Sequence, residues 1–396
     1  MMKGNQVQLT FEELVDAKTG RTTIRLTPKE NIFHRNYFYQ KCFTSDNKKL
    51  LIGGTFDDPD SVMSCDDFKS SLNYHLLDLE SGLITQLTEG NGDNTFGGFL
   101  SHDDQYLYYV KNRKALNRVQ LNTLEEITIF ESDSKWVAYG TWVANSTTTK
   151  MVGIEIAKDD YINLDTWDAF AKMYERNPLC RLFTLDLTTG EQKIIHQEKR
   201  WLGHPMYRPF DDKTVAFCHE GPHDLVKTRI WFIDEDGSNL RAGINQDEDE
   251  HCTHEFWVPD GSLMYYVSFY SGAPKHRFIC SVNPDTLESK KILQMPNCSH
   301  LMSNYNGTLL VGDGTCSPMD VANKEANQIE TDNDLYLFDI ANSRVSSIAE
   351  HHSSWDVFKG SRQITHPHPS FTPDNTAILW SSDCEGNTAV YLTKLE

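Results

Sequence analysis

The chain has 396 residues and a formal net charge of −20, with 39% hydrophobic and 11% aromatic residues. Such a charge disfavours nucleic acid and anionic membranes as partners, so an anionic ligand would need a local positive centre. No apolar run reaches the length of a signal peptide or a membrane span. The nine cysteines include no C-x-x-C pair, which fits a reducing compartment. We therefore expect a soluble, cytoplasmic protein.

A repeated hairpin organises the sequence: an apolar or aromatic run, a short Asp, Asn or Gly turn, and a second apolar run. Its seven copies, in chain order, are FTSDNKKLLIGG from Phe43, LSHDDQYLYYV from Leu100, VANSTTTKMVGI from Val143, RPFDDKTVAFC from Arg208, VPDGSLMYYVSF from Val258, SNYNGTLLVGD from Ser303 and FTPDNTAILWS from Phe371. The turn residues, from Asp46 to Asp374, recur on average about every 55 residues, which leaves room for four strands and their loops.

A second hairpin follows most copies, for example LFTLDLTTGEQKII from Leu182, so each period predicts a four-stranded blade. A short helix is expected at 166–178. The last copy lacks one strand, because VYLTKLE from Val390 reaches the end of the sequence. The run TTIRLTP from Thr22 resembles the missing strand and would protect the open edge. We predict an all-β, seven-bladed β-propeller, a single domain over 1–396 in which 22–27 completes the blade formed by 370–396.

Histidines gather at one position of this repeat. In a propeller, the first strand of each blade lines the central channel. Counting back six residues from each turn residue aligns the first strands at Gln40, Gly97, Tyr139, Pro205, His254, His300 and His368. Three of these seven positions are histidine, although only 15 of the 396 residues are. His204 and His366 lie one and two residues from equivalent positions.

A metal near the axis follows from this pattern. Alternation along a strand would place His366 and His368 on one side, and His300 would come from the preceding blade. Neutral imidazole is the commonest metal ligand in proteins, and a set this rich in imidazole favours zinc, nickel or iron. His254 has no second histidine two residues on, which leaves open a role such as general base. A lone channel histidine such as His204 is more often a hydrogen-bonding residue than a ligand. Arg229 is ambiguous, since an arginine that begins a strand is usually exposed.

At these residues the chain resembles the oligogalacturonate lyases, cytoplasmic pectin-degrading enzymes with a seven-bladed propeller. The resemblance covers essentially the whole length and is most specific in SRQITHPHPSFTPD from Ser361, with support from HCTHEFWVPDG and PHDLVKTRIW, which contain His254 and Arg229. It implies that Gln363, His366, His368 and His300 bind one Mn²⁺ ion. It also implies that His254 is the catalytic base and that Arg229 holds the substrate carboxylate.

The chemistry implied by the resemblance is β-elimination from short 4-linked galacturonides, digalacturonate and its unsaturated form, giving 5-dehydro-4-deoxy-glucuronate. The hydrogen on C5 is poorly acidic until the adjacent carboxylate is neutralised, which a divalent metal and Arg229 could do. These cations would also supply the positive centre that so acidic a chain needs for an oligogalacturonide partner. Further sugar contacts are expected from residues near the blade ends, namely His204, Arg208, His219 and His223.

Three other propeller classes compete with this interpretation. A non-catalytic TolB-like propeller that binds a protein or a sugar shares the D-x-x-T/S-G hairpins but leaves the aligned histidines unexplained. A prolyl-peptidase-like enzyme would need a G-x-S-x-G nucleophile motif, and a sialidase an S-x-D-x-G-x-T-W turn. The sequence contains neither motif.

Overall fold

The computed structural model describes residues 2–59, 72–90, 95–164, 167–270, 273–315, 332–356 and 364–396. They form two compact units along the chain. Within these ranges, no helix has the length and apolar character needed to cross a membrane.

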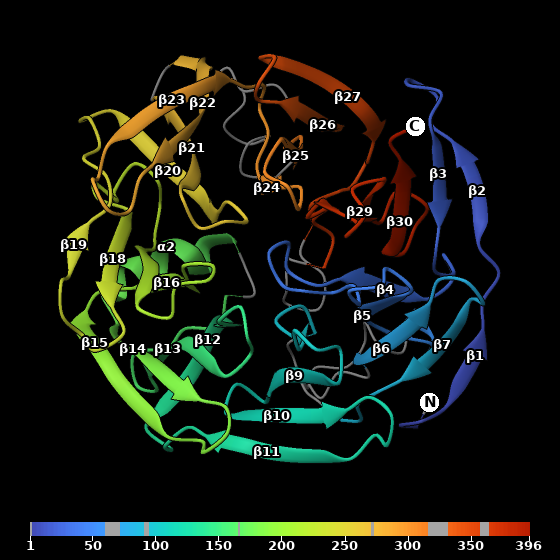
Figure 1. Cartoon of the computed structure of the whole chain (residues 1–396), viewed down its shortest axis with the longest axis horizontal. Coiled ribbons are helices and arrows are strands. Elements are labelled where there is room, and N and C mark those ends of the chain that lie inside the picture. The colour runs from blue at the N-terminus through green and yellow to red at the C-terminus, as the bar shows by residue number, and fades with distance from the viewer. Residues whose placement is uncertain are drawn as a thin grey trace. The chain divides into compact units, whose positions relative to one another are not determined.

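The first unit comprises Met1–Thr128, His300–Pro318 and Thr331–Glu396. Four sheets belong to it, and Figure 1 shows their strands side by side. The first is β1 (Gln6–Gln8), β7 (Leu83–Gln86), β6 (Asn73–Asp78), β5 (Lys49–Thr55) and β4 (Ile32–Arg35). The second is β11 (Glu126–Glu131), β10 (Ala115–Gln120), β9 (Tyr106–Lys111) and β8 (Phe99–Leu100). The third is β24 (Met302–Ser303), β25 (Leu309–Asp313), β26 (Asp334–Asp339) and β27 (Arg344–Glu350). The fourth is β2 (Glu12–Val15), β3 (Thr22–Arg25), β30 (Ala389–Lys394), β29 (Ala377–Ser382) and β28 (Ser370–Phe371).

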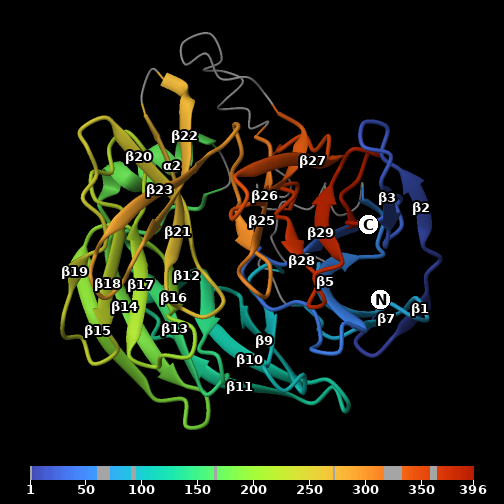
Figure 2. The same cartoon turned by 45° about the horizontal axis from the view of Figure 1, so that its top comes forward.

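The described residues of the second unit lie within Ile129–Ser299 and hold three sheets, whose strands can be followed in Figure 2. The first is β12 (Trp136–Ala144), β13 (Lys150–Ala157), β14 (Leu179–Asp186) and β15 (Gln192–Lys199). The second is β16 (Leu202–Tyr207), β17 (Thr214–His219), β18 (Ile230–Asp234) and β19 (Arg241–Ala242). The third is β20 (Glu250–Trp257), β21 (Met264–Tyr270), β22 (Ala273–Val282) and β23 (Ser289–Gln294). The predicted short helix is present as α2 (Trp167–Arg176).

The seven sheets confirm the predicted fold class, an all-β seven-bladed β-propeller whose last blade is closed by an N-terminal strand. The closing strand is β3, which pairs antiparallel with β30 through Ile24 and Leu392. The single-domain extent over 1–396 stays a prediction. The alternating apolar residues that predicted the blades are the ones buried between neighbouring sheets: Leu50, Leu107 and Leu379, from three sheets of the first unit, share one core cluster.

Two short N-terminal strands were not predicted. β1 pairs with β7 and β2 pairs with β3, so the first and last sheets each have five strands. Both strands lie largely exposed and are polar. Their sequences, QVQ and EELV, are only three and four residues long, which is too short for the repeated alternation that marks the other strands.

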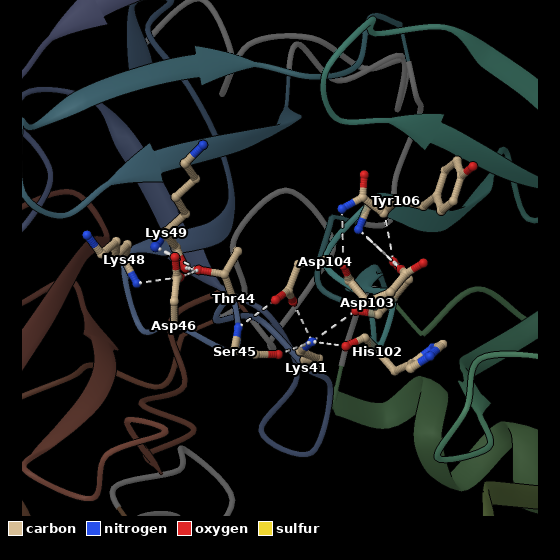
Figure 3. Close-up of polar contacts among 12 residues, drawn as sticks. Lys41, Thr44, Ser45, Asp46, Lys48, Lys49, His102, Asp103, Asp104 and Tyr106 are labelled. Carbon is tan, nitrogen blue, oxygen red and sulfur yellow. Dashed lines mark hydrogen bonds and ion pairs between the residues drawn. The ribbon is translucent and has the colours of Figure 1, made fainter.

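Repeated side-chain turns hold the first two strands of each blade together and also join neighbouring blades. In one turn, the Thr44 hydroxyl donates to Asp46 at 2.6 Å and accepts from the Lys49 amide at 3.0 Å. Figure 3 shows this turn beside the equivalent one around Asp103. Lys41 connects them, because its Nζ donates to Asp104 Oδ1 at 2.5 Å and to the Ser101 carbonyl at 2.9 Å. Because these bonds within each turn join neighbouring residues, the turns can be predicted from the sequence.

Candidate active site

The backbone bonds of the turns fix which residues are equivalent in the seven blades. In each blade, a backbone amide at the start of the turn between the first two strands bonds to a carbonyl at its end; these amides belong to Thr44, Ser101, Asn145, Arg208, Val258, Asn304 and Thr372. Four residues earlier lie Gln40, Gly97, Thr141, His204, His254, His300 and His368. The alignment made by counting was therefore wrong in two blades, where it chose Tyr139 and Pro205. The turn after Arg208 is one residue longer than the others, so counting back from its turn residue reached Pro205 and not His204. Four consecutive blades carry histidine at the shared position.

Three of these four histidines adopt a backbone conformation that is rare for side chains with a Cβ. The φ angles of His204, His254 and His368 are +46°, +52° and +48°. His204 and His254 lie inside β-bulges of β16 and β20, between register pairs that shift. A left-handed residue other than glycine costs about 1–2 kcal/mol, and such strain concentrates at functional sites. The shared strain therefore favours a functional role for this position.

Three histidines of the first unit form one buried cluster. His300, His366 and His368 each offer a ring nitrogen, and these atoms all lie within 4.8 Å of one another. The exposed fractions of the three side chains are 4%, 6% and 0%. His366 and His368 precede β28 in a loop rather than alternating along a strand, so the expected strand geometry was wrong although the predicted grouping is present. Gln363, the fourth expected ligand, lies outside the described residues.

Asp313, at the end of β25, organises two members of this cluster. Its fully buried carboxylate accepts the backbone amides of His300 at 2.8 Å and His368 at 3.2 Å. It also lies 2.9 Å from Nδ1 of His300. A carboxylate that accepts Nδ1–H fixes the tautomer and presents Nε2 as the coordinating nitrogen, which is the usual support for a metal-binding histidine. This donor set fits a divalent metal.

Aromatic rings enclose the cluster. The centroid of Trp355 lies 4.2 Å from that of His366 and 5.5 Å from that of His300. Tyr37 packs against His368 at 5.0 Å. On the other side, the buried Arg35 donates from Nη1 to the His368 carbonyl at 2.6 Å. Packing and hydrogen bonds together hold the imidazoles in place.

The other predicted catalytic residues belong to the second unit. His254 is partly exposed and is followed directly by Glu255 in the bulge of β20. Arg229 is not exposed at the start of a strand but only 2% accessible. Its Nε donates to Glu255 at 2.8 Å and its Nη1 to Glu220 at 3.1 Å. The imidazole of His204 lies near the same two carboxylates, with Nδ1 2.8 Å from Glu255 and Nε2 3.6 Å from Glu220.

The pKa values of these groups favour charged forms despite burial. Burial alone would raise the pKa of Glu255, but Arg229 and His204 hold it well below its usual value. Burial opposes the charge of Arg229, yet the carboxylates of Glu255 and Glu220 raise its pKa well above the usual value. The pKa of the Cys218 thiol is raised well above normal by burial. His204, Cys218 and Glu220 could also group around a cation, but the neutral thiol and the adjacent guanidinium disfavour one.

The remaining predicted sugar contacts have protein partners. Arg208 forms a two-bond ion pair with Asp285 at 2.8 and 3.1 Å. His219 lies 2.9 Å from Glu198 and packs on Trp231 at 4.8 Å. The carbonyl of His223 accepts a hydrogen bond from His251, and burial lowers the pKa of His223 to about 4. Their roles toward a sugar stay predictions.

Comparisons with known proteins agree with this geometry. The family model described as oligogalacturonate lyase matches residues 1–396. The oligogalacturonide lyase of Pectobacterium atrosepticum is 56% identical, over 100% of this chain and 98% of that protein. The oligogalacturonate lyase of Dickeya dadantii is 55% identical over the same shares. A solved structure of an oligogalacturonate lyase in complex with manganese is 53% identical, with a TM-score of 0.91, covering 100% of this chain and 99% of that one.

These full-length matches do not favour the alternative of a non-catalytic TolB-like propeller. They agree with the resemblance seen in the sequence. The chain belongs to the oligogalacturonate lyase family.

Proposed function

We propose that this protein is an oligogalacturonate lyase that cleaves short 4-linked galacturonides, digalacturonate and its unsaturated form, by β-elimination. The observation that carries the proposal is the buried triad of His300, His366 and His368, held by Asp313, in a chain that matches lyases over its full length. From digalacturonate the elimination would release galacturonate and a 4,5-unsaturated uronate, which rearranges to 5-dehydro-4-deoxy-glucuronate. A cytoplasmic location and the absence of nucleic-acid and membrane partners stay predictions.

The histidine triad would hold one divalent metal, with Gln363 proposed as a further ligand. We propose manganese, the metal named with the solved relative. Imidazole chemistry alone would rank zinc, nickel or iron ahead of it. When bound, such an ion supplies Lewis acidity that neutralises a carboxylate next to the reacting carbon.

His254 would act as the base. In the elimination, the C5–H bond breaks and its proton passes to His254, the electron pair forms the C4=C5 double bond, and the C4–O4 bond breaks. The departing O4 takes a proton from water. An imidazole is suited to this step because its ordinary pKa lies near neutrality. Arg229 would help to hold the substrate carboxylate, since three of its five N–H groups bond Glu220 and Glu255 and two remain.

The test is direct. Purified protein with Mn²⁺ and digalacturonate should produce a rising ultraviolet absorbance, because the C4=C5 double bond is conjugated with the carboxylate. Protein stripped with a chelator serves as the control, and re-addition of Mn²⁺ should restore the rise. No absorbance change under any divalent metal would refute the lyase assignment.

A further inference from the structure

Four side chains form a closed ring of polar contacts, called here the Arg229 cluster: the buried Arg229, Glu220 and Glu255, and the partly exposed His204. Glu255 bonds Arg229 with both oxygens, at 2.8 Å to Nε and 3.3 Å to Nη2. The same carboxylate reaches Nδ1 of His204 at 2.8 Å. Glu220 closes the ring, at 3.1 Å from Arg229 and 3.6 Å from His204. Each carboxylate therefore contacts both the Arg229 guanidinium and the His204 imidazole.

Glu255 holds the central place in this cluster. Its side chain is 1% exposed, and two-bond pairing with a guanidinium fixes orientation as well as distance. Burial would favour the neutral acid, but Arg229 and His204 keep its pKa well below the usual range, so the carboxylate is ionised at neutral pH. A buried ion pair of this kind is a better device for fixing geometry than for adding stability.

The cluster is joined through the main chain to the proposed base. Glu255 directly follows His254, and both lie within the bulge of β20 between the register pairs at Thr253 and Phe256. His254 has a strained φ of +52° there. A strained residue persists only where its surroundings fix it, and the Glu255 side chain is the anchor nearest to it along the chain.

We propose that Glu255 is a positioning residue for the elimination: its carboxylate fixes Arg229 and His204 and, through the bulge of β20, the backbone that aims His254 at C5. This inference rests on the proposed function. A base misplaced by about 1 Å can lower a rate by about 100-fold, so a loss of this anchor should appear mainly in kcat.

The experiment compares E255Q with a matched control, E155Q. Glu155 is fully buried in β13 of the same unit and pairs with Arg181 at 2.7 Å and Gln192 at 3.0 Å. It therefore matches Glu255 in burial and in its arginine partner. Each variant is assayed for kcat and KM on digalacturonate with saturating Mn²⁺, for Mn²⁺ affinity by titration, and for thermal unfolding. E255D keeps the charge and tests rescue.

We expect E255Q and E155Q to lose similar thermal stability, whereas only E255Q loses kcat, by about tenfold or more, with KM changed by less than about threefold. Mn²⁺ affinity should stay at the wild-type value in both, and E255D should recover part of the lost kcat. The inference is overturned if E255Q keeps kcat within about threefold of wild type, if E155Q loses as much, or if E255D is no better than E255Q. A wild-type protein without lyase activity would overturn the proposed function as well, whereas an active wild type with an active E255Q overturns the inference alone.

Discussion

Replacing Asp313 by Asn should weaken metal binding without removing a ligand. The carboxylate accepts three N–H groups, the amides of His300 and His368 and Nδ1 of His300. An amide has one oxygen, so whichever way it turns, its NH₂ group faces one of these donors. A buried N–H left without an acceptor costs about 1–3 kcal/mol, and the bond that orients His300 loses its charge.

Loss of such an outer carboxylate lowers metal affinity by about 10–100-fold, which corresponds to about 1.4–2.7 kcal/mol. We expect D313N to show this loss in calorimetric Mn²⁺ titrations, while kcat at saturating Mn²⁺ changes much less. The control is D234N, because Asp234 also ends a strand, is 4% exposed and pairs with Lys213 at 3.0 Å. D234N should lose stability but keep Mn²⁺ affinity. If D313N bound Mn²⁺ as tightly as wild type, the proposed role of Asp313 would be wrong.

Further predictions concern the separate roles of His254 and His366 and the effect of pH on stability. H254A should abolish turnover while Mn²⁺ stays bound, whereas H366A should weaken Mn²⁺ binding and lose turnover for that reason. If H254A also failed to bind Mn²⁺, His254 would be a metal ligand and not the base. Burial lowers the pKa of His34 and His351 from 6.5 to about 4 in the folded protein. As the pH is lowered below 6.5, these histidines become protonated in the unfolded chain but stay neutral in the folded one, so the free energy of unfolding decreases. Each histidine should lower the free energy of unfolding by about 2 kcal/mol when the pH falls from neutral to about 5. Urea unfolding of chelator-treated protein measures this change, and equal stability at both pH values would contradict the prediction.

The blades could be predicted because their signals are local. Turns such as Thr44 to Lys49 are made by neighbouring residues, and the paired strands alternate apolar side chains. The closing strand β3 could be predicted because the last blade lacked a strand and TTIRLTP matched it. The strands β1 and β2 were not predicted because three or four largely exposed residues are too short to show such a pattern.

The site was predictable only as a gathering of histidines. Counting placed His254, His300 and His368 correctly but missed His204, since one extra residue in the following turn shifted the alignment. Asp313 and Glu255 act through contacts between segments far apart in sequence. Nothing near either residue marks it, so only the folded chain shows what it does.

The pairing of β3 with β30 also sets an order of events during synthesis. The strand Thr22–Arg25 is made long before its partner Ala389–Lys394, because the rest of the propeller lies between them in the sequence. The blade that they share therefore cannot be completed until the residues up to Lys394 have left the ribosome. Contacts so distant in sequence form slowly, and the waiting strand edge is open to other chains. The charged residues of β2, Glu12 and Glu13, lie on the other side of β3, at the outer edge of the completed sheet, where charge discourages pairing with other chains.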